Sequence, residues 1–85
     1  MKYIINTKKV IFTQLGEEGV LMDVEKNEYQ SMNETYFRIF QMVSEGEDSE
    51  DIIHALREEY QVEEQVCRAE VERVIQELLK KEYIR

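Results

Sequence analysis

The sequence predicts an α+β domain in which a three-stranded antiparallel sheet is followed by three α-helices. Two observations support this order. Apolar and polar residues alternate up to residue 32, as in half-buried strands, and from residue 34 the apolar residues recur every three or four positions, as on one face of a helix. Because 85 residues suit one small domain, we expect residues 1–85 to form a single unit.

Three strands are predicted in the first third of the chain. KVIFTQL at 9–15 is rich in β-branched and aromatic residues, and VLMDV at 20–24 and EYQSM at 28–32 follow it. The glycines of GEEG at 16–19 mark the first turn. Asn27, in the second turn, belongs to a residue type that tolerates a positive φ. We also consider a short strand over KYII at 2–5.

The first helix is predicted to begin after Asn33, a good N-cap residue, and to end near residue 45, before a left-handed Gly46. Met32 and Phe37 have the spacing of a hydrophobic staple, which would fix how the strand enters the helix. Asp48 is the expected N-cap of the second helix.

The second and third helices are predicted from their apolar stripes. The second directs four residues inward: Ile52, Ile53, Leu56 and Tyr60. The third spans about 63–81, and its stripe consists of Cys67, Val71, Val74, Ile75 and Leu78. The (i, i+4) ion pairs expected on the helices are Glu34–Arg38, Glu64–Arg68 and Glu77–Lys81. A small sheet followed by three helices resembles a winged helix-turn-helix domain, and Tyr83 and Ile84 are expected to cap its core.

No catalytic or metal-binding constellation is apparent in the sequence. A dyad of the single histidine and the single cysteine, His54 and Cys67, is conceivable, but Cys67 lies within an apolar stripe and is better explained as a small buried hydrophobe. The spacing of metal ligands and a glycine-rich phosphate loop are both missing. We therefore expect a protein without enzymatic activity, metal or cofactor.

The charge distribution argues against a nucleic-acid partner. Residues 34–85 carry seven Lys and Arg against fourteen Asp and Glu, and the segment 63–82 has six Glu against four Lys and Arg. DNA binding requires Lys and Arg on the phosphates, so duplex DNA would be repelled, and a winged-helix regulator is the least favoured alternative. One cysteine and the absence of a long apolar run favour a cytoplasmic protein that does not bind membranes.

A binding module is the remaining class, and the third predicted strand is the part of the chain that suits it. This strand is largely polar and could lie at a sheet edge; its residues are Glu28, Tyr29, Gln30, Ser31 and Met32. An exposed edge offers unpaired backbone N–H and C=O groups that an extended peptide can complete. The alternative is that these polar residues only protect the edge from aggregation.

The segment GVLMDVEKNEYQSMN at 19–33 resembles the signature of the PqqD-like family, the RiPP recognition elements. The shared pattern is a glycine, an apolar pair with aspartate (Leu21, Met22, Asp23), a turn, a tyrosine (Tyr29), and an apolar residue before asparagine (Met32, Asn33). The similarity extends from about Lys9 to the C-terminus. Departures are Asn27 for a common glycine, Phe40 for a frequent tryptophan and Glu82 for a glycine that usually ends the last helix.

The resemblance implies a function. Members of this family bind the leader segment of a ribosomally made precursor peptide, which adds as a strand to the third β-strand and packs against the last helix. Carried over, this assigns backbone pairing to Glu28–Met32 and a groove wall to Glu70, Arg73, Val74 and Glu77. The alternative is a solvated helix face for Glu70, Arg73 and Glu77, and plain core for Val74.

A free-standing module of this length resembles the discrete recognition proteins of lasso peptide biosynthesis. Its expected partners are the leader region and a separate leader peptidase, and we expect a monomer. The alternative partner is a radical SAM enzyme, as in pyrroloquinoline quinone assembly, for which the chain would be a peptide chaperone.

Overall fold

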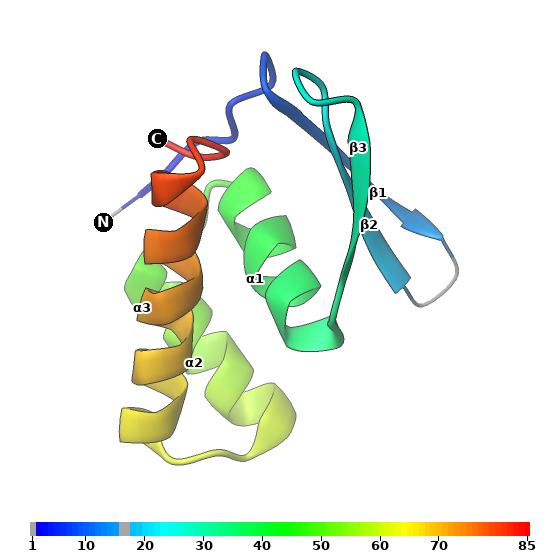
Figure 1. Cartoon of the computed structure of the whole chain (residues 1–85). Coiled ribbons are helices and arrows are strands. Elements are labelled where there is room, and N and C mark those ends of the chain that lie inside the picture. The colour runs from blue at the N-terminus through cyan, green and yellow to red at the C-terminus, as the bar shows by residue number, and fades with distance from the viewer. Residues whose placement is uncertain (1, 16–17) are drawn as a thin grey trace.

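The computed structural model describes residues 2–15 and 18–85 and has the predicted order of elements. The strands β1 (Val10–Leu15), β2 (Glu18–Asp23) and β3 (Glu28–Met32) form an antiparallel sheet in the order β1-β2-β3. The helices α1 (Glu34–Ser44), α2 (Ser49–Tyr60) and α3 (Glu64–Lys80) follow. Figure 1 shows all three helices on one side of the sheet, with α1 between the sheet and the other two helices.

The predicted bounds of the third strand are confirmed, whereas the second strand begins earlier than predicted. Glu18 and Gly19 belong to β2 and do not form the turn that GEEG suggested; residues 16–17 lie outside the described residues. Gly19 pairs with Met32 of β3 in the regular register. Because Gly19 has no side chain, β2 can approach Phe37 of α1 closely: a Cβ at position 19 would lie 2.7 Å from Phe37 Cβ and nearer still to the ring.

The predicted helix caps are confirmed. The side-chain oxygen Oδ1 of Asn33 accepts a hydrogen bond from the backbone N–H of Tyr36 at 2.8 Å, and Asp48 Oδ1 accepts one from Glu50 N–H at 3.0 Å. Gly46 has φ 82°, and Asn27, in the second hairpin turn, has φ 56°. Asn27 and Asn33 therefore set the two ends of β3 and the start of α1, and Gly46 and Asp48 set the connection from α1 to α2.

The core forms where α1 meets the sheet and the other helices. Ile39 and Phe40 of α1 are fully buried, as are Leu21 of β2 and Leu78 of α3. Tyr83 and Ile84 are buried, as expected for a cap on the core. Tyr60 does not point into the core as predicted: it is 36% exposed, because α2 ends there and the chain turns away through a left-handed Gln61.

The N-terminal segment does not join the sheet, so the strand considered over KYII is wrong as an addition to it. This segment pairs instead with the C-terminal tail: Ile4 N–H donates to Arg85 O at 2.8 Å, Arg85 N–H returns to Ile4 O at 2.9 Å, and Asn6 N–H donates to Tyr83 O at 2.8 Å. The two ends of the described chain therefore lie together, as Figure 1 also shows.

Two of the three predicted ion pairs form with other partners. Arg38 binds Glu59 of α2 at 2.7 Å, and Arg68 binds Glu50 of α2 at 2.6 Å, so both pairs connect helices. Only Glu77–Lys81 forms within its helix turn as expected, at 3.6 Å.

Candidate functional site

The outer side of β3 is a free sheet edge among the described residues, since β2 is its one neighbour in the sheet. Val24 N–H donates to Lys9 O, so on β2 the backbone groups of even-numbered residues face β1, and those of Leu21 and Asp23 face β3. The partners of Leu21 and Asp23 are Gln30 and Glu28. The alternate residues, Tyr29 and Ser31, therefore direct their N–H and C=O groups outward.

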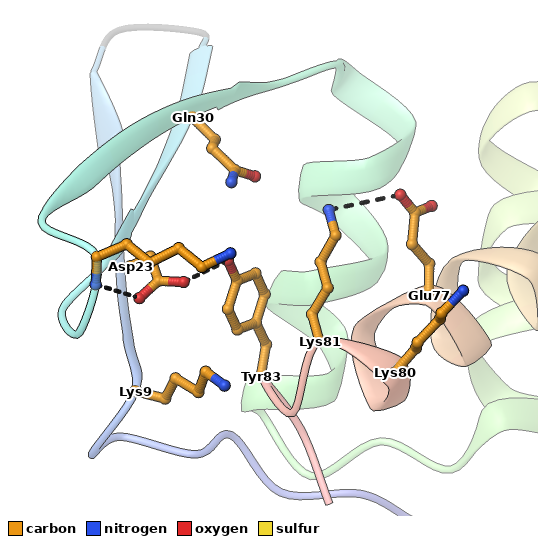
Figure 2. A pocket seen from close by; sticks show the side chains of 8 residues that line it. Lys9, Asp23, Gln30, Glu77, Lys80, Lys81 and Tyr83 are labelled. Carbon is orange, nitrogen blue, oxygen red and sulfur yellow. Dashed lines mark hydrogen bonds and ion pairs between the residues drawn. The ribbon is translucent and has the colours of Figure 1, made fainter.

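A groove separates this part of β3 from the C-terminal end of α3. One hollow, of about 480 Å³, is lined by the hairpin turn, β3, the end of α3 and the C-terminal tail; its residues are Lys9, Asp23, Lys26, Gln30, Glu77, Lys80, Lys81 and Tyr83. A second hollow, of about 200 Å³, continues along β3 to the start of α1 and shares Gln30, Glu77 and Lys81 with the first. Gln30 on β3 and Lys81 beyond α3 point into this space (Figure 2).

The floor of the larger hollow contains a buried hydrogen bond between Asp23 and Tyr83. The Tyr83 hydroxyl donates to Asp23 Oδ2 at 2.8 Å, and Lys26 N–H donates to Asp23 Oδ1 at 3.0 Å. The hydrogen bonds from Lys26 and Tyr83 lower the pKa of Asp23, and burial together with the adjacent carboxylate raises the pKa of Tyr83 to about 12. This contact connects the β2–β3 hairpin to the C-terminal residues and positions the two parts of the chain that line the larger hollow.

The predicted groove wall on α3 divides into an exposed and a buried part. Arg73 binds Glu70 at 2.7 Å and Glu77 at 3.2 Å, and these three charged side chains form a ladder along the helix surface. Hydrogen bonding to Arg73 lowers the pKa of Glu70. Val74 is fully buried in the core, so it cannot line a surface groove as the resemblance implied; its alternative assignment as core holds.

Tyr36 of α1 connects the two walls of the groove. It lines the smaller hollow together with Ser31, Met32 and Glu77. Burial raises the pKa of the Tyr36 hydroxyl, and the negative charge of Glu77 contributes to the same shift. Three of the five predicted β3 residues therefore line one hollow with Glu77 and Tyr36: Gln30, Ser31 and Met32. Glu28 and Tyr29 line neither hollow beside β3.

A third hollow lies at the other end of α3 and is mostly apolar. It has a volume of about 270 Å³ and is lined by Thr35, Leu56, Tyr60, Val62, Val66, Cys67 and Glu70. Val66 is 59% exposed and Val62 38% exposed, which leaves apolar surface open to a partner. Glu70, which belongs to the predicted site, lies here and not in the hollows beside β3.

Sequence reasoning missed several groove residues, chiefly Lys26, Lys80, Lys81 and Tyr83. Lys80 and Lys81 follow Glu77 by three and four positions, so helical spacing alone could have placed them on the same face. Nothing in the local sequence indicates that Lys26, from the hairpin turn, or Tyr83, from the tail, faces that surface.

The remaining reactive residues do not form a site. Cys67 is buried, donates its thiol to Ile53 O at 3.4 Å and has a pKa raised by burial. His54 is exposed and pairs with Glu58 at 3.3 Å. Among residues 2–15 and 18–85, no cluster of His, Cys, Asp and Glu could hold a metal ion. In the same part of the chain, no helix is both long enough and apolar enough to span a bilayer.

Comparisons with known proteins agree with the fold. The structure matches that of TbiB1 in complex with the TbiA(beta) leader peptide with a TM-score of 0.85, at 25% identity over 99% of this chain and 94% of that one. It also matches a lasso peptide synthetase B1 complexed with the leader peptide, with a TM-score of 0.84 at 23% identity over 99% and 96% of the two chains. No curated protein matches the sequence. Residues 18–84 match the family model of coenzyme PQQ synthesis protein D (PqqD), and the chain therefore belongs to the PqqD family.

Proposed function

We propose that this chain is a non-catalytic module that binds the leader segment of a ribosomally made precursor peptide. The leader adds as a strand to β3 and packs against α3, and the complex delivers the precursor to a separate leader peptidase of lasso peptide maturation in the cytoplasm. The observation that carries the proposal is the free edge of β3, with the backbone groups of Tyr29 and Ser31 directed outward beside a groove. The leader-bound state of the similar TbiB1 structure supports it.

The edge alone gives little net affinity. Tyr29 and Ser31 offer two N–H and two C=O groups, and each resulting hydrogen bond contributes about 0.5–1.5 kcal/mol. Ordering a flexible leader costs about 2–5 kcal/mol, which is of the same size. Side-chain contacts in the three hollows must therefore supply most of the net affinity and the specificity.

The role of such a module is to tether the precursor. Binding the leader raises the effective concentration of the cleavage site near the peptidase, with no bond made or broken by this chain. Of the charged α3 residues of the site, Glu77 then belongs to the polar wall of the groove beside β3, Glu70 lines the apolar hollow, and Arg73 binds both. We expect the module to act as a monomer.

A second candidate partner is a radical SAM enzyme, for which the module would act as a peptide chaperone. The match of residues 18–84 to the family model of a coenzyme PQQ synthesis protein favours this alternative. Both candidates share the leader-binding step and differ only in the enzyme that receives the precursor. Co-purification with each class of enzyme in the presence of the precursor distinguishes them.

The strand-addition step is tested by removing one outward N–H. Proline is tolerated at an edge position whose N–H faces away from the sheet, so Ser31→Pro should fold and should bind the leader about tenfold more weakly, for the loss of roughly one hydrogen bond. Ser31→Ala keeps the N–H and should bind like the wild type. Gln30→Pro is the structural control, because the Gln30 N–H faces β2 and its loss should destabilise the sheet.

Binding is measured by calorimetric titration of the precursor encoded beside this gene, with and without its leader. In parallel, the leader should shift the NMR amide signals of Glu28–Met32 and α3 together. Equal affinity of Ser31→Pro and Ser31→Ala, or shifts confined to α2 and the chain ends, would contradict strand addition to β3.

A further inference from the structure

Lysines gather at one end of the groove although the chain as a whole carries a net charge of −8. The hollow between the hairpin turn and the end of α3 is lined by four lysines, Lys9, Lys26, Lys80 and Lys81, against the two acids Asp23 and Glu77. Lysine near a helix C-terminus is favoured by the helix dipole, which accounts for Lys80. The helix dipole does not account for Lys26, which lies in the hairpin turn. Lysines from separate parts of the chain therefore converge on this hollow.

Within the described part of the chain, two of these lysines form no ion pair of their own, although Lys26 lowers the pKa of the Asp23 carboxylate through its backbone hydrogen bond and also through its nearby positive charge. Lys9 binds Glu82 at 3.1 Å, and Lys81 binds Glu77 at 3.6 Å. The ammonium groups of Lys26 and Lys80 form no ion pair with any described residue. The Asp23 carboxylate is buried and already accepts hydrogen bonds from Tyr83 and from the Lys26 backbone. The open hollow therefore presents positive charge that an anionic side chain can neutralise.

The same face of α3 leads from this positive end to the apolar hollow. Val66 lines the apolar hollow and Lys80 lines the positive one, and the two are 14 residues apart. At 1.5 Å per helical residue this is about 21 Å. An extended peptide advances about 3.3 Å per residue, so about six to seven of its residues span the distance.

We propose that the leader taken by this groove carries an acidic side chain that binds Lys26 and Lys80, and an apolar side chain about six to seven residues away that fills the hollow at Val62 and Val66. The inference rests on the proposed function and adds to it the charge and the spacing of the ligand. The acidic contact gives specificity, because a leader with lysine or arginine at that position would be repelled.

The charge of the ligand is tested with the double variant Lys26→Gln/Lys80→Gln and the control Lys2→Gln/Lys8→Gln. Both change the net charge equally, and Lys2 and Lys8 are exposed and line none of the three hollows. The probe is the synthetic leader of the precursor encoded beside this gene, titrated at low and high NaCl. We expect the first variant to bind about three- to tenfold more weakly at low salt and the control to bind like the wild type.

Leader variants locate the contact. Each Asp or Glu of the leader is changed singly to Asn or Gln, and one such change should weaken binding to the wild type but not to Lys26→Gln/Lys80→Gln. Similarly, one apolar leader position changed to Ala should lose its effect in Val66→Ser, and it should lie about six to seven residues from the acidic one. Thermal unfolding of every variant confirms that it is folded.

The outcomes separate this inference from the proposed function. If the leader binds the wild type and both lysine variants equally, or if no acidic position shows coupling, the charge inference is wrong while the leader-binding function stands. If coupled positions exist but lie two or three residues apart, the spacing is wrong. If the leader binds none of the proteins, the proposed function itself fails.

Discussion

Replacing Gly19 by alanine tests how closely β2 approaches α1. A Cβ at this position would lie 2.7 Å from Phe37 Cβ and still closer to the ring, below the 3.0 Å that real Cβ atoms respect. The backbone of Gly19 is not in the positive-φ region, so the cost is steric alone. Phe37 is only 7% exposed and its ring packs edge-on against Phe12 at 6.1 Å, which hinders its displacement.

The magnitude follows from overpacking. Forcing one extra methyl group into a packed core costs about 1–3 kcal/mol, and the burial of the Phe37 ring against Phe12 favours the upper half of that range. A domain of this size has a free energy of unfolding near the low end of about 5–15 kcal/mol. Gly19→Ala should therefore remove a large share of the stability while leaving the fold recognisable by circular dichroism.

The assay is urea unfolding followed by circular dichroism, arranged as a double-mutant cycle. Leucine at position 37 lacks the rigid ring, so Gly19→Ala should cost about 1 kcal/mol less in a Phe37→Leu background than in the wild type. Gly46→Ala is the control: it meets open space but has φ 82°, so its cost comes from the backbone and should not depend on Phe37. Additive effects of the Gly19 and Phe37 changes, within about 0.5 kcal/mol, would refute the close-approach argument.

Three further predictions concern Tyr83, Cys67 and Asn33. The pKa of Tyr83 is raised from 10.0 to about 12, so its stabilising contribution is present below pH 10 and lost as the pH rises towards 12. In Tyr83→Phe the highest of the tyrosine transitions in an ultraviolet titration should disappear; an unchanged titration curve would contradict the assignment. Because the Cys67 thiol is buried and has a raised pKa, it should react with Ellman's reagent much more slowly in the native protein than in urea. Rapid labelling without denaturant would show that α2 and α3 separate readily. Asn33→Ala should lower the free energy of unfolding by about 1 kcal/mol, whereas Asn33→Asp, which keeps the acceptor, should not.

Features decided by neighbouring residues could be predicted from the sequence. Asn33 and Asp48 cap their helices through backbone N–H groups two or three residues away, so a short window contains the whole interaction. The bounds of β3 follow for the same reason, because a positive-φ Asn27 precedes the strand and the Asn33 cap ends it. The edge position of β3 was expected from its polar residues.

Features decided by distant residues could not be predicted. Gly19 suggested a turn because glycines are common in turns, yet the reason for it is a ring 18 positions further along the chain. Arg38 and Arg68 each have a glutamate four positions before them, but α2 offers better-placed carboxylates across the helix interface. Helical periodicity likewise assigns Val74 to a face without showing how deeply that face is buried.

The direction of the backbone groups on β3 required the register of the sheet. From the sequence alone, the backbone N–H group of either Gln30 or Ser31 could face outward, so either residue could be chosen for a proline substitution. The pairing of Gln30 with Leu21, together with the Val24–Lys9 hydrogen bond, shows that only the Ser31 N–H of this pair faces outward. The same dependence on topology explains why Lys26 and Lys80, 54 residues apart, could not be recognised as neighbours in one groove.

The hydrogen bonds between Ile4 and Arg85 have a consequence for how such a module can be used. They bring both ends of the described chain to one point, beside the buried Ile84. A short linker joining these ends, with new ends opened between α1 and α2 at 45–47, should give a circular permutant that keeps all six elements. A domain whose two chain ends lie side by side can also be inserted into a loop of a larger enzyme. The groove and a catalytic site would then belong to the same chain.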